Sequence, residues 1–347
     1  MAGALLAAPL AARAGPVASI RATTVVAAAT FFACAVPLSF AWFFAWRLAA
    51  GVAGGVLMVL AAAAVLPHVP PARRGLASGA IFSGVGLGIA ASGTVVPVLL
   101  RWGLTATWCG LGTLALALTV LAWTGWPRQA AAPHTAPAAR AGRLHSGAGL
   151  KAIYVAYGLN AVGLVPHMVF LVDFVARGLG RGLVVGGRCW VVFGVGAVLG
   201  PVLAGRAADR IGFRVAFRGA LVLQIAAVAV PIVWTSTPWL IASSVVVGAF
   251  VPGVVPLALG RVQELAPPEF RTTAWGRTTT AFALGLTVAG YGFSFIYARM
   301  ASYATLFALG AAVLALALAI DLAVSPRAGA GGPTAAPAPA PPRPAAR

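Results

Sequence analysis

Long apolar runs alternate with short charged turns along almost the whole chain. A helix rises about 1.5 Å per residue, so roughly 20 apolar residues cross the ~30 Å hydrocarbon core of a bilayer. Residues 1–12 are apolar but too short to span. The runs that are long enough cover 20–38, 40–66, 76–100, 104–126, 151–175, 183–204, 215–234, 239–260, 274–297 and 301–323. The pattern therefore predicts an all-α polytopic membrane protein with ten full spans and one stub.

Two polar segments rich in proline and alanine divide this pattern. Residues 127–150 are expected to form a cytoplasmic linker between an N-terminal half, 1–126, and a C-terminal half, 151–323. Residues 324–347 hold seven prolines and no aliphatic run. A segment of this composition buries too little apolar surface to fold, so we expect a disordered tail.

The charge balance fits membrane topology better than nucleic-acid binding. Hydrophobic residues make up 61% of the chain and charged residues only 8%, against about 25% charged residues in soluble domains. The net charge of +19 comes mainly from arginines that alternate with the spans. One set of alternate turns, together with the tail, holds 18 of the 24 Lys and Arg. Because such residues favour the cytoplasmic side, we expect this set and both termini to be cytoplasmic, with no nucleic-acid partner.

The chain also matches itself at a shift of 197 residues. Pro70 and Gly79 fall on Pro267 and Gly276, and other prolines and glycines coincide at the same offset. A constant offset over much of the chain predicts two homologous halves, related as in transporters with parallel repeats. The shift places residue 1 inside the span 183–204 of the second copy. We therefore expect the chain to begin within the second of twelve helices, and the native reading frame to continue upstream.

The most charged short segment lies between the spans 183–204 and 215–234. It has the pattern G-x-x-x-D-R-x-G-x-R, formed by Gly205, Asp209, Arg210, Gly212 and Arg214. This pattern resembles the signature loop that the major facilitator superfamily places between helices 2 and 3 and again between helices 8 and 9. The first copy is degenerate here, because Ala12 stands where Asp209 stands in the second.

The segments 70–93 and 157–180 are most similar to the YbfB/YjiJ-type branch of that superfamily. The resemblance implies two pseudo-symmetric six-helix halves and rocker-switch alternating access, with a small organic solute bound between the halves near the membrane midplane. It implies a monomeric secondary active transporter of the bacterial inner membrane. The identity of the substrate, the direction of transport and the coupling ion stay open, with protons as one candidate.

The signature loop is expected to act as a cytoplasmic gate. Asp209 should pack against the start of the span 274–297, where a helix N-terminus is positive, and Arg277 or Glu264 should complete the charge network. Such a latch exists in only one state, so breaking it should favour the inward-open state.

Two polar stripes on otherwise apolar spans are expected to line the substrate cavity. Burying a polar group without a partner costs about 1–3 kcal/mol, so these stripes should face water or substrate rather than lipid. They comprise Tyr157, Asn160 and His167 on the span 151–175, and Thr287, Tyr291 and Ser294 on the span 274–297. Few charges lie near them, which favours a small neutral or weakly charged substrate. His167 is the candidate proton carrier because histidine titrates near neutral pH, and a structural hydrogen bond is the alternative.

Three further charged residues lie within or near the ends of spans. Arg47 begins the pattern R-x-x-x-G-x-x-G, completed by Gly51 and Gly54, which resembles the helix-4 motif of the superfamily. An arginine inside a membrane is usually functional, and the alternative is one that snorkels to the interface. Asp173 and Arg188 flank one short turn, so they are expected to pair near the periplasmic face or to be two separate interface charges.

Catalysis has little support in the sequence. The five acidic residues are not spaced with histidines as metal ligands or nucleophile partners are, and the three cysteines lie inside spans without metal or redox spacing. We therefore expect no enzymatic activity, no metal and no cofactor. The alternatives are a non-functional transporter fragment, a channel, and a membrane-embedded enzyme with histidines and acids clustered at one depth.

Overall fold

The computed structural model describes residues 2–127 and 147–324, and the regular elements in that part of the chain are helices. Ten of them are long and apolar enough to cross a membrane, which confirms the ten expected spans. The long helices are α2 (Pro16–Cys34), α3 (Phe40–Val65), α4 (Arg74–Leu100), α5 (Leu104–Ala122), α6 (Ala148–Val165), α8 (Gly182–Ile211), α9 (Phe213–Val233), α10 (Thr237–Leu265), α11 (Arg271–Met300) and α12 (Tyr303–Ala323). A shorter helix, α1 (Ala2–Ala14), precedes them, and 3-10 turns lie at η1 (Leu66–His68), η2 (Pro71–Arg73) and η6 (Pro268–Phe270).

One span consists of several helical pieces. After α6, the chain continues through π-helical turns at η4 (Pro166–Phe170) and η5 (Phe174–Gly178), with α7 (Leu171–Asp173) between them. Pro166 has no N–H to donate to the preceding turn, so the regular ladder is interrupted where η4 begins. The whole span therefore runs from Ala148 to Gly178.

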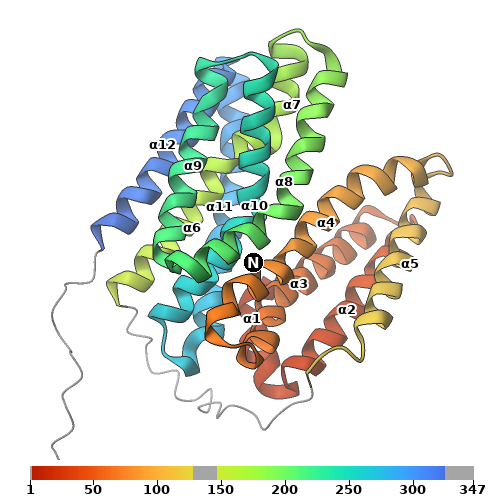
Figure 1. Ribbon diagram of the computed structural model, residues 1–347. Coiled ribbons are helices and arrows are strands. Elements are labelled where there is room, and N and C mark those ends of the chain that lie inside the picture. Colours follow the sequence, from red (N-terminus) through yellow and green to blue (C-terminus); the bar gives the residue numbers. More distant parts are fainter. Residues whose placement is uncertain (1, 128–146, 325–347) are drawn as a thin grey trace, which may run out of the picture.

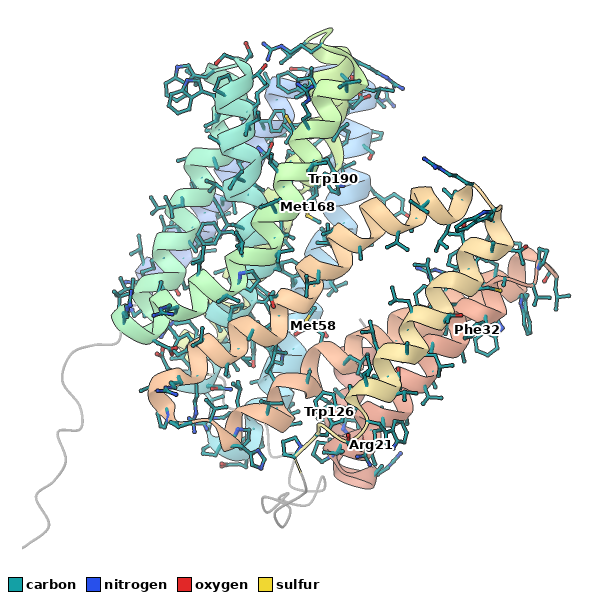
Figure 2. All side chains as sticks on the ribbon, turned by 45° about the vertical axis from the view of Figure 1, so that its right-hand side comes forward. Arg21, Phe32, Met58, Trp126, Met168 and Trp190 are labelled. Atoms are coloured by element: carbon teal, nitrogen blue, oxygen red, sulfur yellow. The ribbon has the colours of Figure 1, made fainter. Side chains whose placement is uncertain are left out.

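The helices form two bundles that stand side by side (Figure 1). The N half consists of α1–α5, and the C half consists of α6–α12. The two bundles meet at the end of the molecule that contains the start of α4 and the end of α8, which we call the closed end. At the opposite end, called the open end, the bundles splay apart. Figure 2 shows the same splay from another side, with Met58 near the junction of the two halves.

Small residues hold α4 against α8 at the closed end. A Cβ atom added to Gly75 would overlap the backbone of Gly205, and one added to Gly79 would overlap the backbone of Pro201. Residues without side chains thus let the two backbones touch, as they do between membrane helices in general. The contact continues to Gly86, where an added Cβ would meet the backbone of Ala197.

A nearly buried ion pair ties two helices of the C half together. Arg218 of α9 donates to the carboxylate of Asp321 on α12 at 2.6 Å and to the Asp321 backbone oxygen at 2.7 Å. The side chain of Asp321 is only 4% exposed. A buried carboxylate is costly unless it is paired and hydrogen-bonded, so removing either partner would leave a charge without compensation.

The expected domain boundaries stay a prediction. Helix α6 begins at Ala148, so the last residues assigned to the linker 127–150 are already helical. Most of that linker, and the tail 324–347 except for its first residue, lie outside the described residues.

Candidate functional site

The signature loop joins the two halves at the closed end, but not through the helix we expected. Asp209, near the end of α8, accepts hydrogen bonds from the backbone N–H groups of Gly75 and Leu76, each at 2.7 Å. These N–H groups belong to the first turn of α4, which has no helical partner for them. The carboxylate therefore lies at the positive end of α4 and accepts hydrogen bonds from two N–H groups that have no partner within the helix.

The expectation that Asp209 meets the start of the span 274–297 is wrong. That segment is α11, which packs against α1, whereas α8 packs against α4. The internal repeat makes α4 the equivalent of α11, and α1 the equivalent of α8. Each of α1 and α8 packs against the helix of the opposite half, so the loop after α8 meets α4. Glu264 pairs instead with Arg261 at 2.6 Å, and Arg277 is exposed.

The remaining residues of the signature loop shape the turn. Gly212 has φ of 84° and ends α8 where α9 begins, a conformation that favours glycine. Arg210 is exposed and Arg214 is half-buried beside this turn. The loop thus combines a tight turn, surface positive charge and one carboxylate directed at the other half.

A tryptophan fills the junction beside α1 and α3. Trp275 is buried on α11 and donates its indole N–H to the backbone oxygen of Met58 on α3, at 3.2 Å. Its ring lies 6.4 Å from that of Phe82 on α4 and 6.0 Å from that of Tyr157 on α6. Aromatic rings from both halves therefore close the space between them above the signature loop.

The polar stripe on α11 continues, toward the open end, the helix face that meets α1 near the closed end. A Cβ atom added to Gly276 would overlap the backbone of Ala4 on α1. Thr287 and Ser294 lie 11 and 18 residues after Gly276, so all three residues are on the same face of α11. Thr287, Ser294 and Tyr291 are exposed, and Tyr291 is 79% exposed. An open cavity of about 250 Å³ is lined by Leu286, Thr287, Gly290, Tyr291 and Ser294.

The other stripe does not line that cavity, contrary to our expectation. Asn160 and His167 are buried with partners inside the C half, whereas Tyr157 is buried beside Trp275 and Phe282 of α11. Asn160 donates to the side-chain oxygen of Gln224 on α9 at 2.7 Å. The sequence pattern marked three polar residues on one helix face, but that face meets partners inside the bundle.

The partners of His167 determine which of its nitrogens carries the proton. Ser243 of α10 lies 2.7 Å from the Nε2 atom of His167 and donates its single hydroxyl proton to the carbonyl oxygen of Ala227, also at 2.7 Å. Ser243 therefore accepts from His167, and Nε2 is protonated. In a neutral ring Nδ1 is then an unprotonated acceptor, and it is buried without a hydrogen-bond partner.

The expected pair of Asp173 and Arg188 does not form. Asp173 pairs with Arg177, one helical turn later, at 3.2 Å, and it also accepts the hydroxyl proton of Tyr303 on α12. Arg188 is exposed and is not the ion-pair partner of Asp173. The local i,i+4 spacing brings Arg177 within reach regardless of how neighbouring helices lie, which explains why it is preferred.

Arg47 is exposed on α3, seven residues after the helix begins at the open end. Its guanidinium lies over the ring of Trp108 on α5, 5.7 Å from the ring centre. A cation above an indole face is favourable without neutralising the charge. The arginine therefore keeps its full charge in an apolar part of the N half.

Sequence reasoning missed Trp275, Gln224 and Ser243. A serine or glutamine on a long apolar span is a signal for a buried hydrogen bond, because an unpaired polar group is costly there. Trp275 lies in the segment that the internal repeat aligns with residues 70–79, which points to a similar place in the fold. Among the described residues, no group of three or more His, Cys, Asp and Glu could hold a metal ion.

Comparisons with known proteins give one family and several similar folds. The family described as "Uncharacterised MFS-type transporter YbfB" matches residues 1–322. The human organic anion transporter MFSD10 (TETRAN) is 18% identical, with a TM-score of 0.75 over 92% of this chain and 80% of that chain. A variant of the E. coli fucose:proton symporter FucP is 12% identical, with a TM-score of 0.73 over 93% of this chain and 87% of that chain. The proton:xylose symporter XylE is 15% identical, with a TM-score of 0.70 over 93% of this chain and 83% of that chain. No curated protein matches.

Proposed function

Because the chain belongs to the YbfB family of major facilitator superfamily transporters, we propose that it moves a small organic solute across the bacterial inner membrane by alternating access. Membership makes it a multi-pass membrane transporter of a superfamily that is typically not enzymatic. The finer statements, which concern solute, coupling ion and membrane, are our proposal.

One observation carries this proposal: the two halves are tied at one end and apart at the other. Asp209 bonds the start of α4, and Trp275 bonds Met58 of α3. Both contacts cross between the halves and neither can persist if the closed end opens. A ligand that favours the opposite arrangement must offset these contacts, which is how binding and conformation become coupled.

We assign the closed end to the cytoplasm. The turns and helix ends gathered there include Arg73, Arg74, Arg206 and Arg210, and positive residues favour the cytoplasmic side. In this assignment the structure is an outward-open state, α12 ends on the cytoplasmic side, and the stripe on α11 is reached from the periplasm. The N-terminal end of α1 is not cytoplasmic, contrary to our expectation, because Gly3 packs against Val52, half-way along α3. The protein acts as a monomer, because the two halves of one chain supply both walls of the opening.

Protons are the coupling ion we propose, as for the two sugar symporters of similar fold. His167 is the carrier candidate, since its Nδ1 is a free acceptor. Because His167 is fully buried here, it would exchange its proton in another state of the cycle.

Proton flux in vesicles tests this function. Protein is reconstituted with a trapped pH-sensitive dye and offered sugars, monocarboxylates and amines in turn. We expect one class of solute to change the internal pH, and His167→Ala to abolish that change. An unchanged proton signal in His167→Ala would remove this residue from coupling. Radiolabelled solute uptake that is insensitive to an imposed pH gradient would contradict proton coupling itself.

A further inference from the structure

We propose that Asp173 is a proton-binding residue at the open end, and that its ionised form holds the outer part of the α6 span against the turn between α11 and α12. The outer part comprises Pro166–Gly178, and Figure 1 shows it, at the label α7, at the end where the two bundles splay apart. This adds a group at the open end to the proposed proton coupling, on which the proposal rests only for its role in transport.

Both carboxylate oxygens of Asp173 are engaged, and they bind two different segments. Oδ2 accepts the hydroxyl proton of Tyr303, the first residue of α12. Oδ1 lies 3.2 Å from Nε of Arg177, which is one turn later in η5. An ionised carboxylate only accepts hydrogen bonds, so a proton bound to either oxygen removes one acceptor and the negative charge. Proton binding therefore competes with these two contacts.

The ring of Tyr303 lies between the outer part of the α6 span and the end of α11. Its centre is 5.3 Å from that of Phe174 and 4.7 Å from that of Tyr297. A Cβ atom added to Gly178 would overlap the Tyr303 ring. Residues of both segments thus enclose the ring, and its hydroxyl bonds Asp173. The bond to Asp173 is therefore the polar part of an otherwise aromatic interface.

The segments on both sides of this bond depart from regular helix geometry. Asp173 is the last residue of α7, which lies between the π-helical turns η4 and η5. Such turns are rare and occur mostly at functional sites. On the other side, α11 is followed by Ala301, whose φ of 48° lies in the left-handed region that residues other than glycine seldom adopt. Side-chain contacts therefore have a larger part in docking these segments than they have between two regular helices.

The other charged and titratable groups around Asp173 have contacts of their own or are exposed. Besides Arg177 and Tyr303, the open-end parts of the neighbouring elements carry His167, Arg181, Arg188, Cys189, Tyr297 and Arg299. Arg181 donates to the hydroxyl of Thr237. The guanidinium of Arg299 lies over the ring of Phe295. Arg177 is therefore the cation that pairs with Asp173 in the described part of the chain.

The remaining acids of the sequence lie at the other end of the molecule. All four belong to the described residues and lie near the closed ends of helices or in η6, namely Asp209, Glu264, Glu269 and Asp321. Among the described residues, a response of the open end to acid pH would come from Asp173 or from His167. A substitution at Asp173 separates these two sources.

The direction of the pH effect follows from the ionised form. This form makes both contacts, so they are present at neutral pH and are lost as the pH falls and Asp173 binds a proton. The outer part should then leave the α11–α12 turn more often. Asp173→Asn resembles the protonated acid, because the amide has the same shape, no charge and only one acceptor oxygen.

Hydrogen exchange measures this release without transport and without a substrate. The full chain is placed in phosphatidylcholine nanodiscs, and amide exchange is followed at about pH 7.5 and at about pH 4, where an aspartate ordinarily titrates. The rates are corrected for the pH dependence of chemical exchange. Peptides that cover residues 171–180 and 301–308 report the two segments, and one that covers 215–225 of α9 reports the rest of the C half.

Both reporting peptides should exchange about tenfold faster at low pH, and the α9 peptide should not change. Asp173→Asn should give the fast rates at both pH values. Tyr303→Phe keeps the ring but loses the hydroxyl, so it should exchange faster at neutral pH and show a smaller pH effect. The matched control is Glu269→Gln, which removes an exposed acid at the closed end and should behave as the unchanged protein does.

A pH response that persists in Asp173→Asn would overturn the proposal, because another group such as His167 would then cause it. Faster exchange in all three peptides would indicate general loosening, and faster exchange in one segment alone would indicate no joint release; either result would overturn it as well. The assay needs no transport, so the expected response in a protein that moves no solute would contradict the proposed function and leave this site intact.

Discussion

Asp209 is the residue through which a charge links the two halves. Its two carboxylate oxygens accept the Gly75 and Leu76 N–H groups, and Asp209→Asn would keep the size but lose the charge and one acceptor. A charge at a helix N-terminus contributes about 1 kcal/mol, so we expect the closed end to open roughly fivefold more often. Maleimide labelling of a cysteine at Ser78, which is buried at the closed end, should accelerate by that factor.

The control for this substitution is Glu269→Gln, which removes an exposed acid at the same end. It should leave labelling at Ser78→Cys unchanged. Equal acceleration by the two substitutions would show that net charge, rather than the bond to α4, governs the closed end.

Ser243 and Ser244 are adjacent buried serines with different hydrogen bonds. Ser243 bonds His167 and the Ala227 oxygen on other helices, whereas the Ser244 hydroxyl donates to the Leu240 oxygen of its own helix and has only the weakly hydrogen-bonding Cys189 thiol as a partner on α8. Ser243→Ala leaves two buried groups unpaired and should destabilise the protein by about 1–3 kcal/mol. Ser244→Ala leaves the helical ladder intact and should cost less. Thermal unfolding in detergent measures both, and equal melting temperatures for the two variants would contradict the His167 network.

At this scale the sequence predicts which residues are polar and costly to bury, but not what they meet. Asn160 and Thr287 look alike as polar positions on apolar spans, yet Asn160 bonds Gln224 and Thr287 lines an open cavity. The difference depends on which neighbouring helix lies against each face. That information resides in long-range packing, which one helix's periodicity does not contain.

At the scale of the element, α4 is the helix whose two faces differ most sharply. A Cβ atom on Gly79 would overlap the backbone of α8, and one on Gly84 would meet nothing within 4 Å. Gly79→Ala should therefore force the helices apart and accelerate labelling of the Ser78→Cys reporter. Gly84→Ala should leave labelling unchanged and could raise the melting temperature, because alanine stabilises a helix by up to about 1 kcal/mol over glycine. Equal behaviour of the two variants would contradict the close α4–α8 contact.

The spans themselves follow from length and hydrophobicity, and all ten are present. Their pairing is harder to predict. The internal repeat makes α4 and α11 equivalent, so it offers two candidate helices for Asp209 and does not select one. Selection comes from the arrangement of the halves, in which α8 lies against α4 and α1 against α11. The ion pair of Asp173 was missed for the opposite reason, since its partner Arg177 is local and needs no tertiary contact.

At the scale of the whole molecule, the arrangement is that of one end-state of a rocking motion. The halves touch through side chains and backbones at the closed end, and the α11 stripe lines an open cavity toward the open end. Interfaces that pack closely tend to have discrete alternatives rather than a continuum, so a second state should close the open end as the closed end separates.

Two distances measured together test alternating access most directly. Spin labels at exposed Leu104 of α5 and Leu183 of α8 report the open end, and labels at His68 and Val215 report the closed end. In lipid nanodiscs we predict two populations at each end, and Asp209→Asn should enrich the shorter open-end and the longer closed-end separations. A single population at both ends that Asp209→Asn does not alter would contradict alternating access in this chain.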